Sequence, residues 1–467
     1  MEKKETRGSF TGSLGFVLAA AGSAVGLGNI WRFPYLAAKA GGGIFLLCYL
    51  ILALTFGFTL LITEISIGRK TGKSPLAAYG SLHPRMNWVG VIACVIPALI
   101  LPYYCAIGGW VLKYLGTYVT GNGMAAVQDG YFGDFIGSVW PPVIWFLIYL
   151  GATMFVVYKG VDKGVEKFSR LLMPLLLVLI FGISIFSLTL KYDDGSQIRT
   201  GLQGLKVYVV PNFDGMTIKQ FVVVLMDAMG QLFYSISVAM GIMITYGSYV
   251  KKDTDINKSV NRIELFDTVV AFLAGMMIIP AVYTFMGREG MSASGPALMF
   301  VALPKVFGTM GPVLGTAIGI LFFLTVSFAA LTSSVSIMEA VVSCAIDKFH
   351  WERKKAVLVV SGLAAVLGIT VCLGYNVFYF ELALPNGTKA QILDILDYAS
   401  NFVLMPVVSI ATCVLVGWVL KPKTVIEEVQ RNGEPFGRKS LYVVMCKFVT
   451  PALLLLLLLQ ALGILKV

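Results

Sequence analysis

The chain has 467 residues, of which 57% are hydrophobic and only 13% are charged, and its mean hydropathy is +0.83. A soluble domain of this length needs a far more charged surface, so this composition excludes an ordinary soluble protein. The formal net charge of +11 does not indicate nucleic-acid binding. Most of the lysines and arginines fall in alternate loops between apolar segments, which is typical of the cytoplasmic loops of membrane proteins.

Eleven apolar segments are long enough to cross a bilayer, since a hydrocarbon core of about 30 Å needs roughly 20 helical residues. They cover about 12–37, 43–68, 88–119, 140–158, 166–189, 218–249, 264–286, 311–346, 356–374, 394–420 and 441–465. The bias of basic residues predicts a cytoplasmic N-terminus and an extracellular C-terminus. We therefore expect an all-α, multi-pass protein of the cell membrane, with the lipid bilayer as its surroundings and no nucleic-acid partner.

The spans divide the chain into units. We expect a cytoplasmic tail at 1–11, a first five-helix unit at 12–190, an extracellular loop at 191–217, a second five-helix unit at 218–420, a cytoplasmic loop at 421–440 and an eleventh transmembrane helix at 441–467. Because each unit has an odd number of spans, the second is inserted upside down relative to the first. This arrangement predicts an inverted repeat.

The first span carries helix breakers and polar residues together. Glycines stand at 22, 26 and 28, and Asn29 and Arg32 follow directly. Each glycine weakens a helix by roughly 1 kcal/mol relative to alanine. A close helix–helix contact through Gly22 and Gly26 explains the glycines but not the polar residues, which are costly inside a membrane. An unwound turn whose free carbonyls and amide bind a hard cation explains both.

The sixth span is interrupted in the same way. Gln231, Ser235, Ser237 and Gly241 stand within an otherwise apolar run. Spans one and six are the first helices of the two units, and paired broken helices of an inverted repeat indicate a substrate and ion site near the bilayer midplane.

Enzymatic chemistry has no support in the sequence. The seven cysteines lie in or beside apolar spans, the two histidines lie in predicted inner loops, and no pair has zinc-ligand spacing. We expect a protein that is not an enzyme and that has no transition-metal site.

The run from Gly22 to Pro34, GSAVGLGNIWRFP, resembles the signature of the neurotransmitter:sodium symporter family. Similar motifs follow in order over nearly the whole chain: GVDKGVEK at 160–167, Gly230-Gln231, TYGSY at 245–249 and LTSS at 331–334. The resemblance implies the fold of the bacterial leucine transporter, a 5+5 inverted repeat with broken helices one and six. It also implies sodium-coupled import of an amino acid by alternating access.

The resemblance also implies residue roles. It implies no cofactor, and no metal except two coupling Na⁺ ions. Sodium site 1 would consist of the Ala24 carbonyl with Asn29, Ser235 and Asp267. Sodium site 2 would consist of the carbonyls of Gly22, Val25 and Ala329 with the hydroxyls of Thr332 and Ser333. The residues implied for the amino-acid substrate are Ala24, Gly26, Gly28, Ile100, Tyr104, Tyr234, Ser235, Ser237, Ala239, Met240, Ser334 and Ile337.

Two departures from the family pattern bear on specificity. Asp267 stands where the family usually has asparagine, so its charge, near Tyr49 and Gln231, would replace chloride and make transport chloride-independent. Gly26 stands where monoamine transporters have an aspartate. The substrate should therefore bring its own carboxylate, and the surrounding residues favour a neutral, hydrophobic amino acid.

The remaining charges inside the membrane resemble the family's gates. Arg32 with Asp397 would form the outer gate, and Arg7 with Asp347 the inner gate. Static ion pairs that help the spans pack are the alternative. Two other functions stay open: a membrane sensor of the same fold that binds its ligand without transporting it, and a gated ion channel lined by spans one and six. The oligomeric state is also open.

Overall fold

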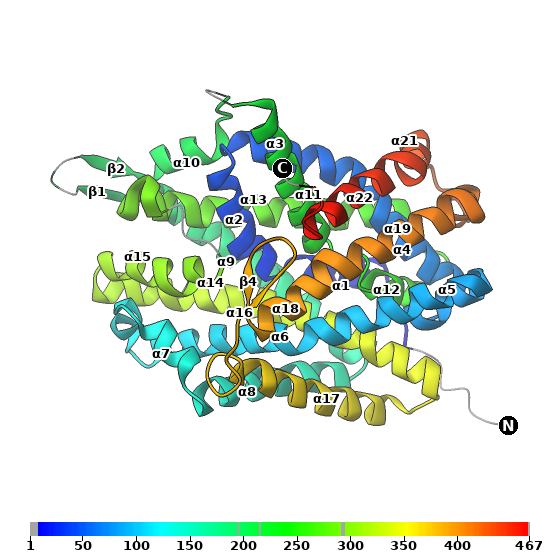
Figure 1. Cartoon of the computed structure of the whole chain (residues 1–467), viewed down its shortest axis with the longest axis horizontal. Helices are drawn as coiled ribbons and strands as arrows, with labels where there is room; N and C mark the ends of the chain where they lie inside the picture. Colours follow the sequence, from blue (N-terminus) through cyan, green and yellow to red (C-terminus); the bar gives the residue numbers. More distant parts are fainter. Residues whose placement is uncertain (1–7, 194, 196, 214–215, 291–294, 466–467) are drawn as a thin grey trace.

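The computed structural model describes residues 8–193, 195, 197–213, 216–290 and 295–465. Within these residues the chain is helical except for loops and two short hairpins (Figure 1). One hairpin pairs β1 (Lys191–Asp193) with β2 (Ile198–Thr200), and the other pairs β3 (Leu382–Ala383) with β4 (Lys389–Ala390), both antiparallel. The described residues therefore form an all-α structure.

The first half contains α1 (Ser13–Ala24), α2 (Phe33–Lys39), α3 (Gly43–Leu52), α4 (Phe58–Thr71), α5 (Pro75–Leu82), α6 (Asn87–Val119), α7 (Tyr131–Gly137), α8 (Trp140–Tyr158), α9 (Lys167–Thr189) and α10 (Gly201–Val209). The second half contains α11 (Ile218–Ser235), α12 (Ile242–Tyr249), α13 (Ile256–Gly290), α14 (Gly295–Ala297), α15 (Leu303–Thr309), α16 (Pro312–Phe349), α17 (Arg353–Leu373), α18 (Ile392–Asp397), α19 (Met405–Val414), α20 (Lys423–Val429), α21 (Lys439–Val444) and α22 (Thr450–Ala461). Short π-helical turns join several neighbours into longer rods, such as Ala53–Gly57 between α3 and α4.

Nine helical segments of the described chain are long and apolar enough to cross a membrane. A tenth is the bent pair Ser13–Ala24 and Gly28–Lys39, whose axes differ by 51°. The remaining predicted span is the pair α11 and α12, which the non-helical residues 236–241 separate. Both breaks therefore lie in the spans where the sequence predicts them.

Several helix bounds differ from the apolar segments. Helix α13 begins at Ile256 instead of 264, because hydropathy marks only the apolar part of a helix and the polar residues before it continue the same hydrogen-bonding pattern. The short helices α5, α7, α10, α15 and α20 were not predicted, since none is long enough to span a bilayer.

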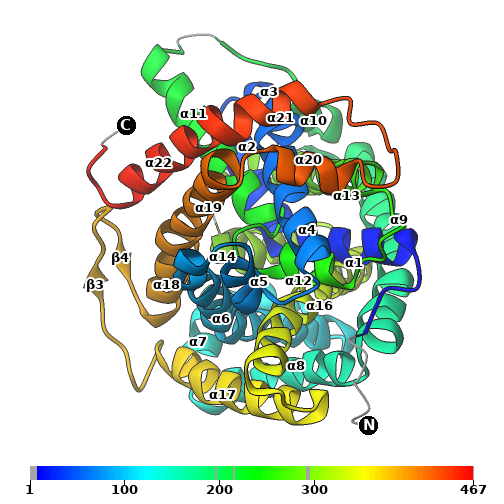
Figure 2. The ribbon, with the colours of Figure 1, turned by 90° about the vertical axis from the view of Figure 1, so that its right-hand side faces the viewer.

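The centre of the molecule is built around the broken helices. Helix α1 packs against α9, α13 and α16, and α12 packs against α4 and α16. Figure 2 shows α4, α12 and α16 near the middle, with α9, α17 and α22 towards the outside. Outward-facing side chains such as Leu171 and Val178, each 68% exposed, are apolar, as a helix surface in contact with lipid requires.

Candidate functional site

The two helix breaks meet at the centre of the molecule. The Ser237 hydroxyl, in the break of span six, donates to the Ser23 carbonyl at the end of α1 (3.0 Å). The Ser23 hydroxyl in turn lies 3.0 Å from the Ser237 hydroxyl. These bonds satisfy polar groups that the missing helical turns leave without partners, at a depth where water cannot do so.

Residues 236–241 follow an unusual backbone path. Ser237 and Ala239 have φ values of 54° and 65°, in the left-handed region that side chains other than glycine rarely adopt, and Gly241 has φ 72°. Such a path costs free energy and persists only where surrounding contacts stabilise it. The break in span six is therefore a specific feature of the fold that tertiary contacts stabilise.

Three of the residues predicted for sodium site 1 are in direct contact. The Asn29 amide donates to Asp267 Oδ1 (2.9 Å), and the Ser235 hydroxyl donates to the same oxygen (2.7 Å) while lying 2.9 Å from Asn29 Oδ1. All three are at most 3% exposed. Ala24 lines the same small cavity as Asn29 and Ser235.

The contacts of Asp267 suit a bound cation. Its other oxygen accepts from the Tyr49 hydroxyl (2.9 Å), so every hydrogen-bond donor that the described residues give it is neutral. A buried carboxylate is costly unless a positive charge accompanies it, and clustered oxygen atoms are the ligands that hard cations prefer. This donor set fits a sodium ion held by Asn29, Ser235 and Asp267.

Of the two residues predicted near Asp267, Tyr49 hydrogen-bonds to it in the described structure. Gln231 Nε2 donates instead to the Gly28 carbonyl (3.0 Å). Gln231 Oε1 is buried and has no hydrogen-bond partner among the described residues. The amide therefore supports the break in span one, and the carboxylate keeps its contacts with Tyr49, Asn29 and Ser235.

The residues predicted for sodium site 2 are also brought together. The Ser333 hydroxyl on α16 lies 3.3, 3.0 and 3.4 Å from the carbonyl oxygens of Gly22, Ser23 and Val25. On the same helix the Thr332 hydroxyl donates to the Ala329 carbonyl (3.0 Å). One hydroxyl proton cannot satisfy three carbonyls at once, so this cluster has the excess of oxygen atoms that suits a small cation.

Gly22 packs closely at this second cluster. A Cβ at Gly22 would lie 3.3 Å from both Thr332 Cβ and Met173 Sδ, which is tighter than ordinary van der Waals contact. A side chain here would require Thr332 and Met173 to shift by a few tenths of an ångström. The glycine thus suits the close approach of α1 to α16.

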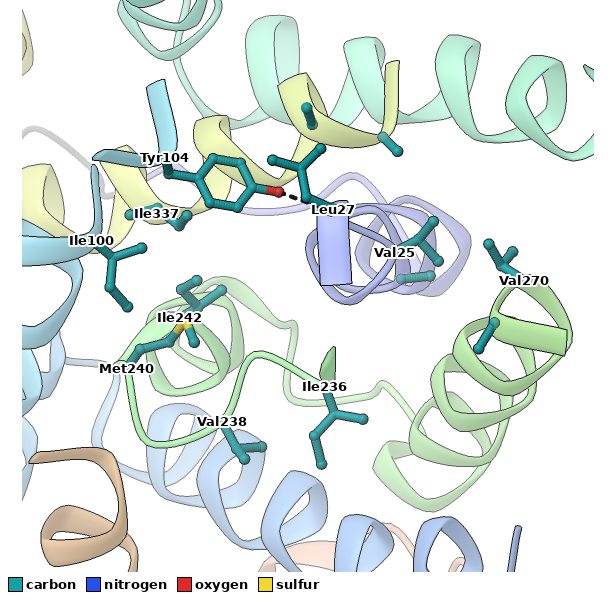
Figure 3. Packing of buried hydrophobic residues seen from close by; sticks show 14 of the residues in the cluster. Val25, Leu27, Ile100, Tyr104, Ile236, Val238, Met240, Ile242, Val270 and Ile337 are labelled. Carbon is teal, nitrogen blue, oxygen red and sulfur yellow. Dashed lines mark hydrogen bonds between the residues drawn. The ribbon is translucent and has the colours of Figure 1, made fainter. Parts of the chain in front are cut away.

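A small cavity of about 30 Å³ lies between the two breaks. Figure 3 labels several of its lining residues, among them Ile100, Tyr104, Met240 and Ile337. Ten of the residues predicted for the substrate line it, together with Ser23, Leu27, Asn29 and Ser333, which were not assigned to the substrate; the ten are Ala24, Gly26, Gly28, Ile100, Tyr104, Tyr234, Ser235, Ser237, Met240 and Ile337. The Tyr104 hydroxyl accepts from the Leu27 amide (3.3 Å). A cavity of this size holds about two water molecules, so an amino acid can enter only if the lining side chains move apart.

Two residues predicted for the substrate do not line this cavity. The Ser334 hydroxyl faces span four, where it lies 2.9 Å from the Thr153 hydroxyl. The Ala239 amide donates to a carboxylate oxygen of Glu64 on α4 (2.6 Å). Both residues therefore lie outside the lining of this cavity as it stands.

Comparison with known proteins places this geometry in a family. The family model described as "Sodium:neurotransmitter symporter family" matches residues 7–124 and 134–466. The chain belongs to the sodium:neurotransmitter symporter family. It is 33% identical over 464 residues to the "Uncharacterized sodium-dependent transporter YhdH" of Bacillus subtilis, with 97% of each chain covered.

More distant relatives and a solved structure agree. The "Sodium- and chloride-dependent GABA transporter 2" of Homo sapiens is 26% identical, and the match covers 92% of this chain and 77% of that protein. The crystal structure titled "Crystal structure of MhsT in complex with L-phenylalanine" superposes with a TM-score of 0.84 at 33% identity, covering 97% of this chain and all of that one. The chain is thus a multi-pass, sodium-dependent transporter of this family with the leucine-transporter fold, and its family is not one of enzymes.

The predicted gate residues are arranged differently from a closed ion pair. Arg32 stands over the Phe402 ring, 5.5 Å from its centroid, and forms no ion pair with Asp397 within the described residues. The Asp397 carboxylate instead accepts from the Tyr103 hydroxyl (3.1 Å) and the Asn401 amide (2.5 Å). Arg32 still acts electrostatically on the Asp397 carboxylate, so the two groups lie near each other without a direct ion pair, and their gating role stays a prediction.

Of the two residues predicted for the inner gate, the structure describes only Asp347. Arg7 lies outside the described residues, so its predicted contact with Asp347 has no structural account. Asp347 itself accepts a hydrogen bond from the Ser74 backbone amide (2.7 Å). This bond joins the end of α16 to the start of α5.

Sequence reasoning missed Glu64, on α4. One carboxylate oxygen accepts from Ala239 in the break of span six (2.6 Å), and the other is buried without a hydrogen-bond partner among the described residues. A lone acid in an apolar span is itself a signal of function, and this one stood in the sequence TLLITEIS. Glu64 holds the backbone at the left-handed Ala239, so it is part of the site.

Proposed function

We propose that this protein is a sodium-coupled symporter that imports a neutral, hydrophobic amino acid by alternating access and does not require chloride. The observation that carries the proposal is Asp267, a buried carboxylate with only neutral donors at the meeting point of both helix breaks. A fixed negative charge beside the ion site supplies what a chloride ion would otherwise supply. Two sodium ions, one at each oxygen cluster, are the coupling ions.

The proposed substrate class follows from the cavity lining. Apolar and aromatic side chains predominate on one side, notably Ile100, Met240 and Ile337, and none of the cavity's lining residues carries a charge. A charged substrate side chain would be buried unpaired, which is costly. The substrate carboxylate would instead meet the sodium ion, the Tyr104 hydroxyl and free amides of span one. The L-phenylalanine named for the similar crystal structure is a molecule of this class.

The driving force is sufficient for concentrative uptake. A tenfold sodium gradient supplies about 1.4 kcal/mol per ion, and a potential of 100 mV adds about 2.3 kcal/mol per charge. Two ions would therefore supply about 7.4 kcal/mol, enough for accumulation on the order of 10⁵-fold. In this mechanism the N-terminus is cytoplasmic and the C-terminus extracellular, and Arg32, Asp397, Arg7 and Asp347 act in gating.

Uptake into proteoliposomes tests the proposal. The purified protein is reconstituted, and labelled phenylalanine and leucine are offered with an inward sodium gradient, with potassium in place of sodium, or with gluconate in place of chloride. We expect saturable accumulation that requires sodium and persists in gluconate. Sodium-dependent binding without accumulation would favour a sensor, and competition by glutamate, lysine or an amine in preference to neutral amino acids would contradict the substrate class.

A further inference from the structure

A cavity of about 800 Å³ lies apart from the broken helices, where the ends of α2, α10 and α13 come together. Figures 1 and 2 both show α10 beside α2 and α13 on one face of the molecule. In the predicted orientation this is the extracellular face. The mechanism described above does not use this cavity.

Three cations converge on the cavity. Lys39, Lys206 and Arg288 line it. Lys39 and Lys206 stand in the last turns of α2 and α10, and Arg288 follows the non-helical Gly287 near the end of α13. A basic residue at a helix C-terminus offsets that helix's own dipole, which explains each lysine singly. It does not explain why three cations open into one cavity, whose described lining contains no aspartate or glutamate.

Two other cations of the predicted extracellular segments have acidic partners. Lys305 donates to Asp129 (2.5 Å) and Lys389 lies 3.2 Å from Glu381. The hydrogen bond from Lys305 lowers the pKa of Asp129 below its usual range. The structure gives Lys39, Lys206 and Arg288 no ion pair among the described residues. Asp227 interacts electrostatically with Lys39 but does not line the cavity, so the described cavity wall itself brings together three cations and no carboxylate.

Close backbone contacts hold the wall of the cavity in place. Gly42 has φ 59° and pairs with Pro211 in an isolated β-bridge. A Cβ at Gly42 would lie 2.1 Å from the Val207 carbonyl oxygen, so only glycine permits this close approach. The turn between α2 and α3 is thereby fastened to the segment that follows α10, and this fixes the positions of the cations on either side.

We propose that this cavity binds a phosphate-bearing anion, with the headgroup of an anionic phospholipid as the favoured source. A volume in the range of about 300–1,000 Å³ is that of an organic ligand site and is far larger than a halide ion requires. Apolar residues accompany the cations: Val210 lines the cavity and is 48% exposed. Leu202, one helical turn before Lys206 on α10, is 62% exposed. Cations beside exposed apolar residues match an amphiphile that has an anionic head.

Native mass spectrometry of the purified full-length protein tests the proposal, with dioctanoyl phosphatidylglycerol and dioctanoyl phosphatidylcholine as probes. We expect phosphatidylglycerol to bind more tightly than phosphatidylcholine. Each of the single variants Lys39→Gln, Lys206→Gln and Arg288→Gln should weaken phosphatidylglycerol binding about fivefold, since one basic residue contributes about 1 kcal/mol to binding an anionic lipid surface. Single variants keep the test valid if the triple variant does not fold.

The matched controls are the single variants Lys191→Gln, Lys305→Gln and Lys389→Gln, each of which removes one positive charge from another predicted extracellular segment and should bind phosphatidylglycerol as the wild-type does. Titration with inorganic phosphate, read as a shift in melting temperature, separates the two sources. A shift that the three cavity variants abolish would assign the site to free phosphate, and lipid binding without that shift would assign it to lipid. Equal binding of both lipids with no phosphate effect, or cavity variants that bind like the controls, would overturn the proposal.

Discussion

The charge of Asp267 is the feature whose removal should have the largest effect on sodium binding. Asp267→Asn keeps the size of the side chain and one oxygen but removes the negative charge. The carboxylate lies 2.7–2.9 Å from its donors on Asn29 and Ser235, so an ion among these groups would be within about 4 Å of it. At an effective dielectric constant of 20, opposite charges at that distance attract by about 4 kcal/mol.

That attraction corresponds to an upper limit of about 700-fold in affinity, at about 1.4 kcal/mol per factor of ten. Two effects offset part of this lost attraction: the asparagine oxygen can still bind the ion, and a neutral side chain costs less to bury than a carboxylate. We therefore expect sodium affinity to fall about 10- to 100-fold. The assay is sodium-dependent binding of a labelled amino acid at equilibrium, run in chloride and in gluconate. In the variant, chloride should restore part of the lost affinity.

Tyr49→Phe is the matched control, because it removes one hydrogen bond to the same carboxylate (2.9 Å) and leaves the charge. It should lower the melting temperature, while the sodium midpoint stays near that of the wild-type protein. An unchanged sodium midpoint in Asp267→Asn, or a wild-type protein that binds no substrate without chloride, would refute the role given to the carboxylate.

Three further predictions concern the second ion cluster, the break in span six and the cavity. Thr332→Ala combined with Ser333→Ala removes two of five predicted oxygen ligands, so sodium affinity should fall by about tenfold or more, and unchanged sodium dependence of uptake would mean that the ion binds elsewhere. Glu64→Ala should lower the free energy of unfolding by about 1–3 kcal/mol, because the Ala239 amide loses its hydrogen-bond acceptor. Glu64→Gln keeps an acceptor and should therefore melt at a higher temperature than Glu64→Ala. Equal melting temperatures of the two variants would contradict this role of Glu64. Met240→Phe should weaken competition by the largest amino acids first and spare glycine and alanine, and a uniform loss across a panel of twenty amino acids would show that Met240 does not set the size limit.

Long apolar segments and their interruptions were readable from the sequence because the membrane imposes simple rules. A span must be long, apolar and internally hydrogen-bonded, so the glycines and Asn29 in the first segment, and Gln231 and Ser235 in the sixth, stood out directly. Both breaks occur in the spans where they were predicted. Helix ends beyond the apolar segments, as at Ile256, could not be read this way, since hydropathy does not distinguish a polar helix from a polar loop.

Which residues touch was decided by tertiary structure. Composition and motifs were enough to predict a membrane protein with two broken helices and to indicate its family. The sequence left the contacts between distant segments open. It did not show that Ser334 and Ala239 lie outside the lining of the small cavity, that Gln231 hydrogen-bonds to the Gly28 carbonyl, or that Glu64 accepts a hydrogen bond from the break in span six. These outcomes depend on helix rotation and on backbone angles such as the left-handed φ of Ala239. Packing between segments distant in the chain sets both, and no local pattern of residues encodes them.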